Sequence, residues 1–286
     1  MSDRNPYYQR LEHIRDNGVA EQLKRIACAT ILFVSSYIAV VYIDRLATYF
    51  SATAFGYHPT IHFWRISDLP TRYIEWSKER VLLIFTAGSA SLFITITLLL
   101  LAYKKFSKSW AILKMFALWV VFNSLALLGA NLGTSLFGYE NYSSVYFNNF
   151  CVVFLWWGIP AFLLYFFLFL FSVILFIAGY AAVNMLLRFS HSQRLVKKYY
   201  GRLQVLLQLY VFPFILGSLL LIPFSFDNIL FLAFHILGLT LLLIGMIARI
   251  NDFYELHGVY RIELADNKTW LLIVFSMLLL LPVLNR

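Results

Sequence analysis

The sequence has few charged residues, and this shortage excludes most soluble folds. Asp, Glu, Lys and Arg make up 13% of the 286 residues, whereas 61% are hydrophobic and 19% are aromatic. Soluble domains carry about 25% charged and about 45–50% apolar residues, so this composition is typical of a protein embedded in lipid. The net charge of +9 would suggest nucleic acid as the partner of a soluble protein. Here the basic residues cluster in short connections between apolar runs, where orientation in a membrane explains them better, so no nucleic-acid partner is expected.

Cysteines and the common catalytic motifs are also scarce. The two cysteines, Cys28 and Cys151, are predicted at opposite faces of the membrane, farther apart than a disulfide can span. The sequence contains no HExxH zinc motif, no glycine-rich phosphate loop, no GxSxG turn and no Cys–His nucleophile pattern. His58 and His62 are four residues apart, but Pro59 between them argues against the regular helix that would align two metal ligands. The sequence therefore favours a non-catalytic protein without a metal or other cofactor.

Long apolar runs are what the sequence does have, and they predict an all-α, polytopic bundle of membrane-spanning helices. About seven spans are expected, or six if the last and shortest run is not a full crossing. The predicted spans cover residues 26–43, 81–103, 110–137, 160–182, 203–224, 229–248 and 270–284. They form a single transmembrane domain, 26–286, preceded by a cytoplasmic amphipathic segment, 1–25, and interrupted by an outer loop, 44–80.

Two of these runs contain breaks. The apolar run 150–187 is too long for one crossing, yet Gly158-Ile159-Pro160 offers its only break. We expect one span there, with residues 150–158 either interfacial or re-entrant. Pro213 and Pro223 predict kinks in the following span.

The distribution of basic residues orients the bundle. Placing the N-terminus inside puts 17 of the 23 Lys and Arg residues on the inner side and 6 on the outer side. Short cytoplasmic loops carry such an excess in membrane proteins. The sequence therefore predicts a cytoplasmic N-terminus and an outside C-terminus, in a protein of the bacterial inner membrane.

The hairpin formed by residues 81–103 and 110–137 is expected to be the packing centre. Small residues lie at helical spacing on both of its arms: Gly88 and Ser91 on the first, Gly129 and Gly133 on the second. Such small-residue steps let two helix backbones approach closely in a membrane. The short connection makes the two arms antiparallel neighbours, so these residues are predicted to be helix-packing positions.

Five polar side chains are predicted to lie within the membrane: Asn123, Asn131, Asn184, Gln208 and His235. Such groups either line a path for a solute or hydrogen-bond neighbouring helices, at about 0.6–2 kcal/mol each. Because the predicted spans contain no charged pair at mid-depth, the sequence favours the second interpretation.

The order of three segments resembles the core of site-2-protease-type intramembrane metalloproteases. These segments are Asp44–Ile66, Ala87-Gly88-Ser89-Ala90-Ser91 and Asn123–Gly138, and the resemblance covers residues 38–140. That family has a metal-binding helix, a glycine-containing β loop, a helix opening with Ala-Gly-Pro and an Asn-rich third helix. Here Ile43–Ala47 stands where two histidines would flank a glutamate, and no LDG aspartate follows Asn131. The resemblance therefore implies a pseudoprotease scaffold without zinc.

These patterns lead to one main hypothesis and two alternatives. The main hypothesis is a non-catalytic structural or scaffold subunit of a larger membrane complex, which contacts the lipid bilayer and either membrane-protein partners or a second copy of itself. The first alternative is a transporter or channel for a small solute or proton, with Asn123, Asn131 and His235 facing a cavity. The second is a membrane-embedded lipid-modifying enzyme that uses the histidines and carboxylates of the outer loop.

Overall fold

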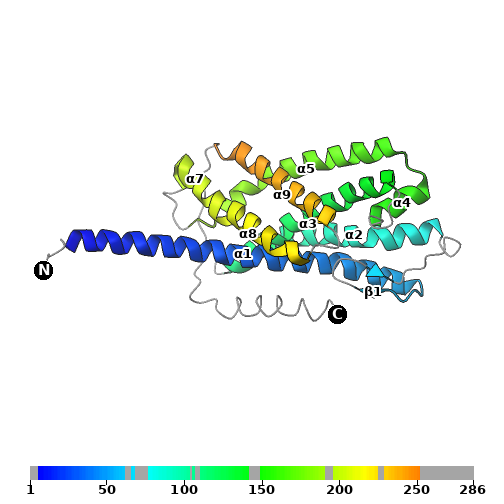
Figure 1. Cartoon of the computed structure of the whole chain (residues 1–286), viewed down its shortest axis with the longest axis horizontal. Helices are drawn as coiled ribbons and strands as arrows, with labels where there is room; N and C mark the ends of the chain where they lie inside the picture. The colour runs from blue at the N-terminus through cyan, green and yellow to red at the C-terminus, as the bar shows by residue number, and fades with distance from the viewer. Residues whose placement is uncertain are drawn as a thin grey trace.

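The computed structural model describes residues 6–61, 66–67, 77–103, 105–106, 110–141, 149–190, 196–224 and 229–251. Within these residues, six helices are long and apolar enough to cross a membrane. They are Glu21–Ala54, Lys78–Tyr103, Ala111–Tyr139, Ala161–Leu187, Tyr199–Leu221 and Ile229–Arg249. The prediction of an all-α, multi-pass membrane bundle is confirmed (Figure 1). The predicted seventh span, 270–284, lies outside the described residues.

The first helix, α1 (Pro6–Ala54), is a single continuous helix of 49 residues. The helix therefore continues past Ile43, where the first span was predicted to end, and past Asp44, where the outer loop was expected to begin; the candidate span is Glu21–Ala54. Charge at Asp44 and Arg45 suggested an end, but the small and apolar residues that follow keep the helical hydrogen bonds intact. In Figure 1, α1 runs along the whole bundle and extends beyond it at its N-terminal end.

A glycine ends α1 instead. Gly56 has φ 84°, a left-handed conformation that glycine adopts without steric cost. Its N–H donates to Thr53 O at 2.9 Å, and the N–H of Tyr57 donates to Ala52 O at 3.2 Å. This pair of bonds is a Schellman motif, which closes the helix. Two short antiparallel strands follow, β1 (Thr60–Ile61) and β2 (Ile66–Ser67). We call this end of the bundle, where α1 ends and α2 begins, the strand end.

The predicted hairpin is present as α2 (Lys78–Tyr103) and α3 (Ala111–Asn141). Only α3 is at the centre, since it packs against α1, α2, α4, α5 and α9. One side of α2 is exposed and carries large apolar side chains, among them Phe93, Ile94 and Leu101. The packing centre is therefore α3, with α2 at the edge of the bundle.

The long apolar run 150–187 forms two helices, α4 (Asn149–Trp157) and α5 (Ala161–Leu187). Gly158 separates them with φ 62°, and Pro160 precedes the first turn of α5. The nine residues of α4 are too few to cross the membrane, and α4 packs against α2 and α3. The single span that was expected in this run is therefore α5, and it begins directly after the expected break at Gly158-Ile159-Pro160.

The remaining spans form a second hairpin. It consists of α7 (Tyr199–Leu206), a π-helical turn η3 (Leu207–Val211), α8 (Phe212–Leu221), a 3-10 turn η4 (Ile222–Phe224) and α9 (Ile229–Arg249). Pro213 has no N–H to donate to the preceding turn. The N–H of Phe212 donates to Leu207 O, five residues earlier, so the helix widens just before the proline.

The backbones of α5 and α9 approach each other closely. A Cβ atom added to Gly179 of α5 would collide with the backbone of Leu242, and one added to Gly245 of α9 would collide with the backbone of Phe176. The sequence contains this reciprocal pair of glycines, but the expected close approach was placed at Gly133.

Candidate functional site: a polar seam between α1 and α3

Polar residues face one another along the contact between α1 and α3. Asn123 Nδ2 donates to Ser36 Oγ at 2.8 Å, across a sequence separation of 87 residues, and to Phe33 O at 3.2 Å. The two helices cross the bundle in the same direction, so the same separation places Asp44 opposite Asn131. We call this set the polar seam: Ser36, Asp44 and Thr48 of α1, with Asn123, Asn131 and Ser135 of α3. All six are buried.

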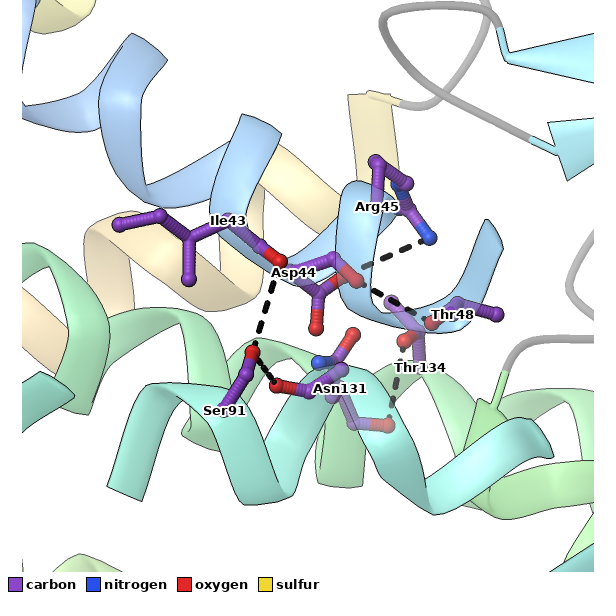
Figure 2. Close-up of polar contacts among 8 residues, drawn as sticks. Ile43, Asp44, Arg45, Thr48, Ser91, Asn131 and Thr134 are labelled. Atoms are coloured by element: carbon purple, nitrogen blue, oxygen red, sulfur yellow. Dashed lines mark hydrogen bonds and ion pairs between the residues drawn. The ribbon is translucent and has the colours of Figure 1, made fainter. Parts of the chain in front are cut away.

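Asp44 is the only acidic residue of the polar seam, and its exposed fraction is 1%. It faces α2 at Gly88, where an added Cβ would lie only 2.8 Å from the Asp44 carbonyl oxygen. The Asn131 side chain lies beside the carboxylate (Figure 2). Asp44, Gly88 and Asn131 each lie ten residues from the strand end of their helix, roughly 15 Å along the axis. The carboxylate is therefore enclosed by three helices within their membrane-spanning parts.

Arg45 is the cationic partner of Asp44, but the contact is long. Arg45 Nη1 lies 3.6 Å from Asp44 Oδ2 (Figure 2), whereas a charge-assisted N–H···O bond is about 2.7–2.9 Å. Adjacent residues point about 100° apart around a helix, so they cannot form a close, aligned pair. The ion pair therefore neutralises the carboxylate only partly.

Four hydroxyl groups surround this ion pair: Thr48, Ser91, Thr134 and Ser135. Each donates to a carbonyl oxygen of its own helix at 2.5–3.1 Å. Ser91 also contacts the carbonyl of Ile43 in α1 at 3.4 Å, which ties α2 to α1 (Figure 2). The proton of each of these hydroxyl groups is therefore directed at the backbone of its own helix.

A second polar group lies farther from the strand end. Tyr37 is seven residues before Asp44 on the same face of α1, roughly 10 Å away along the helix. Its ring contacts His235 of α9 edge-on, with ring centroids 4.7 Å apart. His235 is fully buried, with an exposed fraction of 0%, and no described residue hydrogen-bonds to either ring nitrogen.

Aromatic side chains close the polar seam beyond this level. Trp119 stacks on Tyr210, with ring centroids 5.1 Å apart, and Phe33 packs edge-on against Trp119 at 5.0 Å. The Tyr210 hydroxyl donates to Leu239 O of α9 at 2.8 Å. Tyr210 belongs to the π-helical turn η3, so the irregular part of this span lies at the aromatic barrier.

The structure brings only some of the predicted polar residues together. Asn123 and Asn131 belong to the polar seam, whereas His235 contacts Tyr37, which is next to Ser36 in α1 but is not part of the seam. Asn184 lies near the end of α5, and Gln208 lies in η3. Among the described residues, neither of these two hydrogen-bonds to the polar seam.

The predicted helix-packing residues face different neighbours from those expected. Gly88 faces Asp44 of α1 rather than α3. Gly129 lies against Phe171 of α5, with 3.3 Å between an ideal Cβ and Cε1. Gly133 faces the Phe234 ring of α9. The two glycines of α3 therefore accept aromatic side chains, and not the backbone of α2.

Asp44 and Arg45 are the residues that the sequence analysis missed as a site, because both were assigned to the outer loop. One signal was present: Tyr37, Val41, Asp44, Thr48 and Ala52 follow a 3–4-residue spacing across the expected span end.

No family model, curated protein or solved structure matches this chain. Within the part of the chain that the structure describes, no group of three or more His, Cys, Asp and Glu residues could hold a metal ion.

Proposed function

We propose that this protein is a membrane transporter or channel for a small solute or proton, with Asp44 as the binding residue and the polar seam as the path. The observation that supports the proposal is the buried Asp44 carboxylate, enclosed by α1, α2 and α3 and only loosely paired with Arg45. The sequence favoured a purely structural role for the polar residues because no charged pair was expected within the spans. The continuous α1 places Asp44 and Arg45 within a span, so this argument no longer holds.

A structural role explains this ion pair poorly. Burying a charge costs several kcal/mol even after relaxation, and a pair held at 3.6 Å without an aligned hydrogen bond recovers less of this cost than a close, hydrogen-bonded pair. Apolar residues of similar size would stabilise the helix contacts at least as well. Ionisable residues inside membrane spans are typical of ion paths and proton relays.

Transport currents of the reconstituted protein test this proposal. Proteoliposomes adsorbed on a solid-supported membrane are exposed to separate proton, sodium and potassium gradients. We expect a current for the wild-type protein, its loss in Asp44→Asn, and its retention in Glu79→Gln, which makes the same type of change at an exposed residue of α2. Size-exclusion profiles in detergent establish that each variant is folded. The proposal fails if wild-type liposomes behave like empty ones under all gradients, or if Asp44→Asn conducts like the wild type.

The chain is an integral membrane protein by its six apolar helices, and its orientation is part of the proposal. We place the strand end outside, the N-terminus in the cytoplasm and the C-terminus outside a bacterial inner membrane. Most described basic residues support this placement, because they lie at or beyond the opposite end of the spans, among them Arg25, Lys114, Arg188, Arg202 and Arg249, whereas Lys78 and Arg80 lie at the strand end. Short cytoplasmic connections are the usual position of such residues.

A scaffold subunit is the second candidate, and the exposed surface of α5 supports it. Phe162, Phe166 and Phe169 are large exposed side chains on this helix, and they suit either lipid or the helices of another protein or of a second copy. A stable assembly in several detergents, measured by light scattering after size exclusion, would favour this candidate. A monomer in every detergent would count against it.

The pseudoprotease interpretation is compatible with both candidates. Asp44 belongs to the helix that matches the metal-binding helix of site-2-protease-type enzymes, and Asn131 to the one that matches their third helix. The two residues meet in the structure (Figure 2), but an aspartate, an arginine and an amide stand where the zinc ligands of that family would be. A scaffold without zinc remains our interpretation of this resemblance.

A further inference from the structure

We propose that the species bound at Asp44 is a proton, and that His235 is a second proton-binding residue deeper in the membrane. This inference rests on the proposed function and specifies it. It is carried by two buried ionisable side chains: Asp44 with its loosely held Arg45, and His235, which contacts Tyr37 of α1 and has no described hydrogen-bond partner.

The ligands available at Asp44 favour a proton over a metal cation. Sodium or potassium would need several oxygen ligands and would lie close to the Arg45 guanidinium, which is 3.6 Å from the carboxylate. A proton needs a single carboxylate oxygen, and its binding leaves Arg45 as the only charge of the pair.

The surroundings of His235 indicate that its nitrogens have a use other than packing. A buried polar group without hydrogen bonds destabilises a fold, and a phenyl or aliphatic side chain would pack equally well against Tyr37. A neutral imidazole can accept a proton on one nitrogen and release a proton from the other. This exchange leaves a neutral imidazole in its other tautomer, and rotation of the ring restores the starting state before the next transfer.

The other ionisable groups near His235 do not provide an alternative relay in the described residues. Tyr37 of α1 contacts the ring, and Tyr210 of η3 donates to Leu239 O one turn along α9. The ionisable residues of the neighbouring helices α3 and α5 are either near the ends of α3 or exposed on α5: Lys114, Tyr139, Glu140, Tyr165 and Tyr180.

The proposed relay moves only protons. A proton from water at the strand end binds a carboxylate oxygen of Asp44 and weakens its contact with Arg45. Water molecules that enter the polar seam then carry a proton along α1, past the roughly 10 Å between Asp44 and Tyr37, to His235, which forms an imidazolium while Asp44 becomes ionised again. His235 releases a proton toward the opposite side when the Trp119–Tyr210 barrier opens. One proton enters and one leaves in each cycle, and no bond other than O–H and N–H forms or breaks.

The experiment compares His235→Phe with His58→Phe in proteoliposomes that contain a pH-sensitive dye. His58 is exposed outside the spans, so its replacement makes the same chemical change away from the path. We expect His235→Phe to reduce proton flux at least tenfold, with an unchanged size-exclusion profile and thermal stability, and His58→Phe to keep the wild-type flux. His235→Gln provides a second variant that removes protonation and keeps polarity, in case the phenyl ring does not fit.

A spectroscopic measurement tests His235 without depending on flux. In protein labelled with 15N-histidine, we expect a resonance that shifts with pH and is missing from the spectrum of His235→Phe. The inference is overturned if His235→Phe and His235→Gln both conduct protons like the wild type, while Asp44→Asn does not; the transport proposal then stands without this relay. A current that follows a sodium or potassium gradient and ignores the proton gradient overturns the choice of proton. The absence of any current refutes the proposed function itself.

Discussion

Replacing Gly88 by alanine tests directly whether α2 positions Asp44. The new methyl group would lie where the Asp44 side chain is, and 2.8 Å from the Asp44 carbonyl oxygen. Ordinary contacts of a Cβ begin at 3.4 Å, so α1 and α2 must separate by about 0.6 Å at this point. The carbonyl belongs to the backbone, so no rotation of a side chain relieves the collision.

The size of the effect follows from two opposing contributions. Overpacking a tight contact costs about 1–3 kcal/mol, while alanine in place of glycine stabilises a helix by about 1 kcal/mol. The free energy of unfolding is therefore expected to change between about zero and a loss of 2 kcal/mol. Gly18→Ala is the matched control, because nothing lies within 4 Å of the position of its Cβ in α1. The control should gain up to about 1 kcal/mol, which leaves a difference of about 1–3 kcal/mol between the two variants.

Reversible unfolding in mixed detergent micelles gives both free energies, and the transport assay gives the functional consequence. We expect Gly88→Ala to unfold more easily than Gly18→Ala and to conduct less, because its methyl group displaces the Asp44 carboxylate. If Gly88→Ala is stabilised as much as Gly18→Ala, the close contact between α1 and α2 is absent and the position assigned to Asp44 is wrong.

Two further predictions concern packing and orientation. Gly179→Ala should destabilise the protein more than Gly133→Ala, because the first methyl meets the backbone of α9 and the second meets the movable ring of Phe234; unfolding titrations that rank them in the opposite order would contradict this. A cysteine introduced at Ser143 should react with an impermeant thiol reagent in intact cells, and one at Ser107 should not. Labelling at Ser107 alone would invert the proposed orientation.

The individual spans were predictable because the thickness of the membrane is a local constraint. A helix must keep about 20 apolar residues within the hydrocarbon core, and this requirement can be read from a single run. Four predicted spans agree with α2, α3, α5 and α9 to within a few residues at most ends. The break at Gly158 was equally visible, because a glycine followed by Pro160 interrupts a helix by its own backbone preferences.

The end of α1 was not predictable in the same way. Charge at Asp44 normally marks the end of a span, since an isolated carboxylate in lipid is costly. Here α2 provides space at Gly88, and α3 provides the Asn131 side chain beside the carboxylate. Both residues are distant in the sequence, so nothing near Asp44 shows that the charge is accommodated.

The contacts of the glycines were not predictable for the same reason. The sequence shows where the glycines are, but the spacing of Gly129 and Gly133 does not show which neighbouring side chain or helix each of them contacts. The tertiary structure turns those two toward aromatic side chains and assigns the backbone contact to Gly179 and Gly245. By itself, the sequence determines which segments enter the membrane, because that depends on the hydrophobicity of one run at a time. Only the tertiary structure decides that Asn131 lies beside Asp44 and that His235 contacts Tyr37, because the register between helices depends on side-chain contacts along their whole length.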